Sequence, residues 1–124
     1  MEQLTHYLEK VRPYLNSHPE PKWRFVALLV NRFPISLALN NTNKTHPLIS
    51  KENPKRRLHA EINCLLKANK KFISGSSMYI FRVNSLGNLA LARPCAICLR
   101  LLKKYGVETI IYSTNQIVFK REML

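Results

Sequence analysis

The feature that most constrains the fold of this chain is a pair of short segments that each begin a helical pattern. The first is His59-Ala-Glu61 and the second is Pro94-Cys95-Ala-Ile-Cys98. A β-favouring run over residues 76–83 separates them, so one helix, one strand and a second helix follow each other. We therefore expect an α/β fold in which His59 faces the two cysteines from a neighbouring helix.

The other hydrophobic patterns predict further helices and strands around these segments. Residues 40–57 are polar, contain two prolines and have no apolar period, which predicts a long loop of the kind that is usually functional. Together the patterns predict a helix over 2–15, a hairpin of strands over 23–30 and 35–39, a helix over 58–70, a strand over 76–83, a turn over 84–88 with a short return over 89–92, a helix over 95–105 ended by Gly106, a strand over 107–112 and a last strand from 117 to about 121.

The spacing of the last two strands fixes their relative direction. Only four residues separate Tyr112 from Ile117, whereas a parallel crossover needs a dozen or more. The chain must therefore end in an antiparallel hairpin. It contains no internal repeat and no linker, so residues 1–124 are expected to form a single domain.

The acidic residues exclude several kinds of chemistry. The chain of 124 residues has seven Glu and no Asp. An Asp-based protease, a Ser-His-Asp triad, an EF-hand and a Walker B Asp are thereby excluded. Acid-base catalysis must come from Glu or His.

Against these acids stand 20 Lys and Arg, giving a formal charge of +13. This charge predicts an anionic partner such as a nucleotide, a polynucleotide or an acidic membrane surface, the alternative being that it only promotes solubility. The chain shows no basic and apolar leader, and its longest apolar run, residues 25–30, is too short to span a bilayer. These features predict a soluble cytoplasmic protein without membrane contact.

The cysteine spacing indicates a metal site. Two cysteines three apart at a helix start place both sulfurs beside unpaired N–H groups, where the helix dipole favours thiolates. With a neutral nitrogen from His59 they would cancel the charge of Zn²⁺ and leave its fourth position open, as in catalytic zinc sites. Water held there becomes acidic near neutral pH, and Glu61 is close enough in sequence to take its proton.

The distribution of charged residues around Glu61 is also unusual. It is the only acid between residues 53 and 107, a window that contains eleven Lys and Arg. A generic salt-bridged surface would not distribute charge in this way, so the position favours a catalytic role.

Other interpretations of the cysteines remain open at this point. A thioredoxin-like redox motif would place C-x-x-C after the first strand and would have no use for His59 or Glu61. A structural zinc site would need a fourth ligand, for which His46 is the candidate. Cys64 is most simply a small buried side chain.

With the H-A-E and P-C-x-x-C motifs, the chain resembles the cytidine deaminase-like superfamily of zinc-dependent nucleobase deaminases. The order of predicted elements extends the resemblance over nearly the whole domain. It implies a three-layer α/β/α fold around a five-stranded mixed sheet. It also implies that His59, Cys95 and Cys98 bind Zn²⁺ and that Glu61 is the proton shuttle.

The resemblance further implies contacts to the substrate. The backbone N–H of Ala60 is expected to hold the base carbonyl, and the backbone carbonyl of Arg93 to receive the amine. An Asn after the second strand is expected to touch the sugar, and Asn41 is favoured over Asn40 and Asn43.

The substrate is predicted less directly. The antiparallel final hairpin resembles the branch of free-cytidine deaminases and several deaminase toxins, which favours conversion of cytosine to uracil. Lys55, Arg56 and Arg57 are candidate phosphate contacts that favour single-stranded DNA or RNA, and the other cations expected around the site are Lys70, Lys71, Arg93, Arg100, Lys103 and Lys104. The alternatives are free cytidine, deoxycytidine or their monophosphates as substrates, and a non-catalytic, zinc-stabilised module that binds nucleic acid.

The resemblance also implies a homo-oligomer in which neighbouring subunits complete each other's sites. The final strand, with Ile117, Val118 and Phe119, is the expected edge for that pairing.

Overall fold

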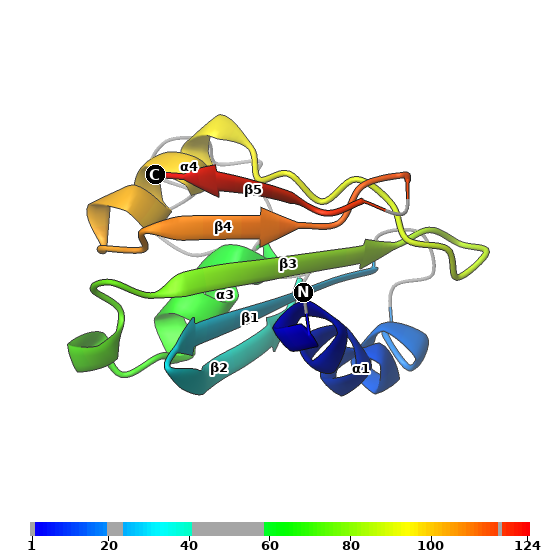
Figure 1. The fold of residues 1–124 in the computed structure, drawn as a ribbon, viewed down its shortest axis with the longest axis horizontal. Coiled ribbons are helices and arrows are strands. Elements are labelled where there is room, and N and C mark those ends of the chain that lie inside the picture. Colours follow the sequence, from blue (N-terminus) through cyan, green and yellow to red (C-terminus); the bar gives the residue numbers. More distant parts are fainter. Residues whose placement is uncertain (1, 20–23, 41–58, 117) are drawn as a thin grey trace.

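The computed structural model describes residues 2–19, 24–40, 59–116 and 118–124, and shows a five-stranded sheet between helices (Figure 1). Nearly all of the predicted long loop therefore lies outside the described residues. No helix in the described ranges is long and apolar enough to cross a membrane. The elements are α1 (Glu2–Asn16), β1 (Arg24–Asn31), β2 (Phe33–Leu39), α3 (Ala60–Lys67), the short 3-10 helix η1 (Lys70–Phe72), β3 (Ser77–Val83), α4 (Ala96–Lys104), β4 (Thr109–Tyr112) and β5 (Lys120–Met123).

The sheet is mixed, with strand order β2-β1-β3-β4-β5. Strand β1 pairs antiparallel with both β2 and β3, and β3 pairs parallel with β4. Strands β4 and β5 are antiparallel. The predicted five-stranded mixed sheet and the predicted final hairpin are both confirmed.

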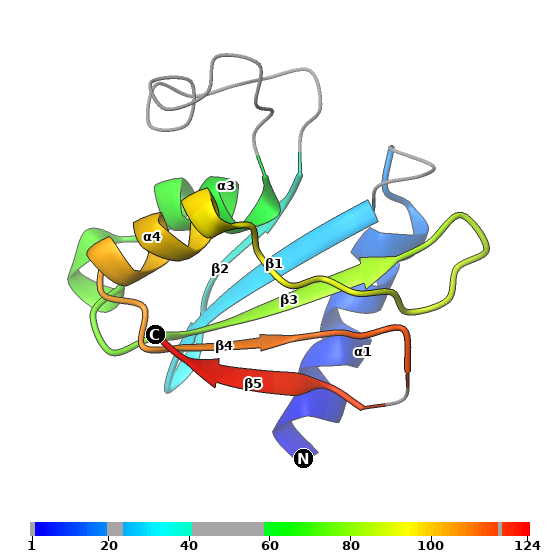
Figure 2. The same ribbon diagram turned by 90° about the horizontal axis from the view of Figure 1, so that it is seen from above.

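Helices cover both faces of the sheet, which gives three layers (Figure 2). On one face α1 packs Tyr7, Val11 and Leu15 into a core that it shares with β1 and β3. On the other face α3 and α4 cover a second core, to which Ala27 and Leu29 of β1 contribute. Successive residues of a strand point to opposite faces, so a run such as Val26–Leu29, buried throughout, requires helices on both sides.

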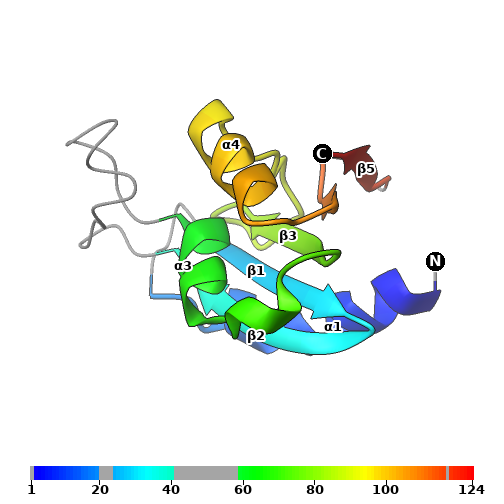
Figure 3. The ribbon, with the colours of Figure 1, turned by 90° about the vertical axis from the view of Figure 1, so that its left-hand side faces the viewer.

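Helices α3 and α4 run in the same direction on one face of the sheet (Figure 2). Each precedes one strand of the parallel β3–β4 pair, and this common connection aligns their axes. Their N-termini consequently lie at one end of the molecule, while their C-termini lie at the end that faces the viewer in Figure 3.

Gly106 ends α4 in the left-handed conformation predicted for a C-terminal glycine, with φ of 101°. Its N–H donates to the carbonyl of Lys103, and its own carbonyl accepts from Gly75 at 2.9 Å. A Cβ at this position would lie 2.9 Å from the Cα of Ser74. The chain therefore needs glycine here both for its conformation and for the close approach of the two segments.

Two predicted boundaries are wrong. Helix α3 ends at Lys67 and not at residue 70, because Ala68 is extended and Asn69 instead caps η1 by accepting a hydrogen bond from the N–H of Lys71. The last strand begins at Lys120, and its pairing with Tyr112 makes the connection longer than the predicted four residues.

The longer connection has a structural cause. Ser113 and Asn115 do not pair with β5 but accept hydrogen bonds from the backbone N–H groups of Ala92 and Leu91. The edge strand consequently has the sequence Lys-Arg-Glu-Met, so the prediction that the last strand is apolar and begins at residue 117 is wrong. Pairing of subunits along this edge stays a prediction. Ile117 lies outside the described residues, and Phe119 packs against Phe81 on the α1 side of the sheet.

Candidate metal and catalytic site

Three potential metal ligands meet where α3 and α4 begin. His59 is the N-cap of α3, Cys95 is the N-cap of α4, and Cys98 lies in the first turn of α4. One ligand atom from each side chain lies within 4.8 Å of the other two. Cys98 Sγ and His59 Nδ1 are 3.3 Å apart. The three residues that the sequence selected are thus brought together by the fold.

These separations fit a tetrahedral zinc site. Zinc bonds of about 2.3 Å to sulfur and about 2.0 Å to nitrogen place such ligands roughly 3.6 Å apart. The measured distance and the 4.8 Å limit bracket this value. A His and two Cys are also a donor set that zinc prefers. Among the described residues, these three side chains therefore fit Zn²⁺ and would supply three of its ligands.

The helix starts supply the electrostatics that such ligands need. The first helical hydrogen bonds run from Asn63 N–H to the His59 carbonyl and from Leu99 N–H to the Cys95 carbonyl. The backbone N–H groups that precede Asn63 in α3 and Leu99 in α4 have no acceptor inside their helix. The N-terminus is also the positive end of the helix dipole, and both effects stabilise thiolates. Cys98 is buried, with 1% of its surface exposed, so the field acts with little solvent screening.

Glu61 lies beside this cluster in the first turn of α3, with only 3% of its surface exposed. Burial raises the pKa of its carboxyl above the usual value, while the nearby His59 and a hydrogen bond with Cys98 act in the opposite direction. Glu61 therefore lies buried beside the three potential ligands, which suits the role in proton transfer that the sequence predicts for it. That role remains a prediction.

Ala60 is the first residue of α3 and is fully buried. Its N–H belongs to the helix turn that lacks internal acceptors, which suits the predicted contact with a base carbonyl. Arg93 lies two residues before Cys95, which suits the predicted role of its carbonyl. These two substrate contacts remain predictions.

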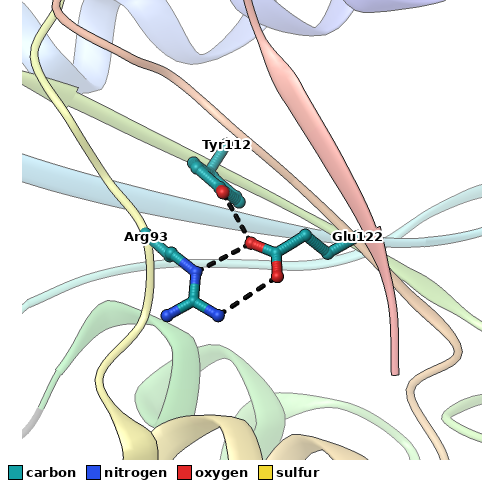
Figure 4. A network of polar contacts seen from close by, with 3 residues as sticks. All are labelled: Arg93, Tyr112 and Glu122. Carbon is teal, nitrogen blue, oxygen red and sulfur yellow. Dashed lines mark hydrogen bonds and ion pairs between the residues drawn. The ribbon is translucent and has the colours of Figure 1, made fainter.

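The Arg93 side chain, however, is already engaged. Its Nε and one terminal nitrogen donate to the two carboxylate oxygens of Glu122 at 2.8 and 3.1 Å (Figure 4). The Tyr112 hydroxyl donates to the same carboxylate at 2.5 Å. These contacts hold the pKa of Glu122 down at about 2, so the Arg93–Glu122 pair carries no net charge at neutral pH.

Among the three candidate Asn residues, only Asn40 is described. Its side-chain oxygen accepts from the Phe25 N–H at 3.1 Å and lies 2.6 Å from His18 Nε2. Asn40 therefore joins the end of β2 to the start of β1. Several predicted residues lie outside the described ranges, namely Asn41, Asn43, His46, Lys55, Arg56 and Arg57.

The expectation that lysines surround the site is wrong for four of them. Lys103 and Lys104 lie in the last turn of α4, and Lys70 and Lys71 lie in η1, beyond the end of α3. Helix α3 has eight residues, and the rise is about 1.5 Å per residue. The length of α3 alone therefore separates Lys70 and Lys71 from His59 by about 12 Å.

Cys64 is separate from the cluster. It is fully buried, its thiol donates to the Ser36 carbonyl at 3.3 Å, and burial raises the pKa of the thiol to about 11. A thiol that stays protonated is a poor metal ligand and a poor nucleophile. The structural role expected for Cys64 agrees with these contacts.

Sequence reasoning did not find Glu122 and Tyr112. The sequence signal for Glu122 is its scarcity, since it is one of two Glu after residue 61, and Tyr112 has no such signal. The Arg93–Glu122 contact joins residues 29 apart in sequence, and the contact of Tyr112 with Glu122 depends on the register of β5.

Residues 1–114 match the protein family described as "Cytidine and deoxycytidylate deaminase zinc-binding region". No curated protein and no solved structure matches the chain. The matched range contains all three potential ligands and Glu61, and ends before β5.

Proposed function

The chain belongs to the family of cytidine and deoxycytidylate deaminases and is a zinc-dependent deaminase, and on that premise we propose that it converts cytosine to uracil. The observation that carries the proposal is the buried carboxyl of Glu61 beside the ligand cluster. We assign His59, Cys95 and Cys98 as the zinc ligands. Residues 1–124 act together as one domain in this proposal.

Each residue at the site then has a defined task. Zinc supplies a Lewis acid that lowers the pKa of water toward neutrality. Glu61 takes one proton from the attacking water and delivers it to the ring nitrogen, where it stays. It then takes the second proton from the hydroxyl now on the attacked carbon and delivers it to the departing amine. The Ala60 N–H holds the base carbonyl, and the Arg93 carbonyl accepts a hydrogen bond from the amine. The C–O bond forms at the carbon whose C–N bond breaks, and ammonia leaves.

We propose single-stranded nucleic acid as the substrate. Support comes from the net charge of +13 and from five exposed lysines at the C-terminal ends of the two helices, namely Lys67, Lys70, Lys71, Lys103 and Lys104. These lysines lie about 12 Å or more from the helix starts, beyond the single phosphate of a bound mononucleotide. A strand whose stacked phosphates advance by about 3.4 Å reaches them within three or four nucleotides.

A free nucleoside or nucleotide is the second candidate, and the Arg93–Glu122 pair favours it. The cation nearest in sequence to Cys95 is neutralised by that carboxylate, so it is not available for a phosphate backbone. A site that accepts only a single nucleoside needs no positive field at its entrance.

One panel of substrates decides between these candidates. Purified protein with zinc is assayed for uracil formation from cytidine, deoxycytidine, their monophosphates and single-stranded DNA and RNA. The nucleic-acid proposal expects turnover of the polymers that falls steeply with salt, with a slope of about −0.7 per neutralised phosphate. Salt-insensitive turnover of monomers with no activity on polymers selects the second candidate.

The same panel tests the deaminase proposal itself. A non-catalytic zinc module that binds nucleic acid would form no uracil from any substrate, and its binding would be unchanged in Glu61→Gln. If Glu61→Gln retained full activity on every substrate, the role of Glu61 would be refuted.

A further inference from the structure

We propose that Glu122 is a positioning residue for the metal site: together with Tyr112 it fixes Arg93, and so fixes the backbone that leads into the ligand Cys95. The inference rests on the proposed role of Cys95 as a zinc ligand. It adds to the site a strand, β5, that lies beyond the family match over residues 1–114.

The contacts around Glu122 define one orientation of Arg93. The guanidinium meets the carboxylate through two hydrogen bonds, and the Tyr112 hydroxyl approaches the oxygen that also receives Arg93 Nε (Figure 4). Two parallel bonds between planar groups allow few relative orientations. Tyr112 is itself 3% exposed, so the carboxylate is held from a rigid part of the core.

The chain before Cys95 is attached, residue by residue, to the segment that follows β4. Ser113 Oγ donates to the Ala90 carbonyl at 2.7 Å, the Leu91 N–H donates to Asn115, and the Ala92 N–H donates to the Ser113 carbonyl. Arg93 then bonds to Glu122. Among the side-chain contacts of the described residues before Cys95, this ion pair is the nearest to the ligand in sequence.

Because Arg93 lies close to Cys95 in sequence, its orientation affects the position of that ligand. Only Pro94 separates Arg93 from Cys95, and Pro94 is buried and has a fixed φ. A rotation of Arg93 therefore moves both the Cys95 sulfur and the Arg93 carbonyl. The pair is partly exposed, with side-chain exposures of 48% and 34%, and exposed ion pairs contribute little to global stability. Its main effect is thus expected on the site and not on the fold.

Glu122→Gln tests this proposal, with Glu108→Gln as the matched control. Both substitutions remove one negative charge, but Glu108 is exposed and makes no ion pair with another described residue. Zinc affinity is measured by competition with a chromophoric chelator, and ligand geometry by the absorption spectrum of the cobalt(II)-substituted protein. We expect zinc affinity to fall by about tenfold or more in Glu122→Gln, with a changed cobalt spectrum, and to stay at the wild-type value in Glu108→Gln.

A charge exchange provides the second test. Arg93→Glu and Glu122→Arg each break the pair, whereas the double variant restores it with reversed polarity. We expect both single variants to lose zinc affinity and the double variant to regain at least part of it. Tyr112→Phe, which removes only the hydroxyl, is expected to give a smaller loss with the fold preserved.

Two results would overturn the proposal. One is a Glu122→Gln protein that melts earlier but keeps the zinc affinity and cobalt spectrum of the wild type, since a purely stabilising residue behaves in this way. The other is a double variant no better than the single ones. Absence of uracil formation in wild type that binds zinc tightly would refute the proposed function and leave this inference standing.

Discussion

The two ends of the α3–α4 pair carry opposite kinds of residues. The N-terminal end gathers His59, Glu61, Cys95 and Cys98 in a largely buried cluster. The C-terminal end presents Lys67, Lys70, Lys71, Lys103 and Lys104 to solvent. The dipole favours thiolates at the first end and cations at the second. The same helix geometry therefore suits both ends, although only one of them can perform chemistry.

Because the lysines and the ligand cluster lie at opposite ends of the two helices, substrate binding by charge and catalysis need separate tests. A change at the N-terminal end should affect the reaction on every substrate. A change at the C-terminal end should affect only a substrate long enough to reach it.

The largest effect is expected from Cys98→Ser at the N-terminal end. Losing one of two thiolates removes a ligand that a serine hydroxyl does not replace at neutral pH, so zinc and deamination should both be lost to background. Metal content is measured on the purified protein together with uracil formation. Cys64→Ser is the matched control, since a hydroxyl can keep the hydrogen bond to the Ser36 carbonyl, and its zinc content should be unchanged.

Glu61→Gln should separate the proton shuttle from the metal. The amide has the shape of the carboxyl but cannot carry the proton, so kcat should fall by about 10²- to 10⁴-fold. Zinc content should stay at one per chain, because the three ligands are untouched. A comparable fall in zinc content would show that Glu61 supports the metal site and would contradict its assignment as the shuttle.

At the C-terminal end, Lys70, Lys71, Lys103 and Lys104 are changed together to Gln. If four phosphates lose their partners, the salt dependence of binding to a single-stranded oligonucleotide should weaken by about three units of log–log slope. The kcat/KM for a monomeric substrate should be unchanged. Fluorescence anisotropy at several salt concentrations measures the slope, and an unchanged slope would remove the structural support for a polymeric substrate.

The smallest effect is expected from acid. The pKa of Glu122 is held at about 2 in the folded chain, below the usual value of 4.5, so its contribution to stability is present above pH 4.5 and lost as the pH falls toward 2. Glu122→Gln should therefore lose less stability than wild type over that interval. Urea unfolding at several pH values measures the difference, and parallel curves for the two proteins would contradict the strength of the Arg93 pair.

Much of the fold was predictable because local patterns agree with the final packing. The run over residues 24–31 is apolar enough to be buried on both faces, and the short final connection allows only an antiparallel hairpin. The zinc ligands were predictable for a related reason. Each stands at a helix start, and helix starts are marked in sequence by Pro94 and by the change of hydrophobic period.

What escaped prediction depends on contacts between distant segments. The end of α3 is set by Ala68 and the cap at Asn69, which differ little from helical neighbours in sequence. The start of β5 is set by hydrogen bonds that Ser113 and Asn115 make to residues 91 and 92. Arg93 was expected near phosphate because its partner, 29 residues away, has no local signal.

Gly106 has a consequence for how sensitivity to substitution should be interpreted in this protein. It lies at the end of α4 far from the metal ligands, yet its φ of 101° and the 2.9 Å approach to Ser74 exclude any other residue without rearrangement. In a library of all single substitutions selected for activity, position 106 would be as depleted as His59 or Cys98. Selection for folding alone would separate them, because depletion at position 106 would persist there while depletion at the ligands would be relieved.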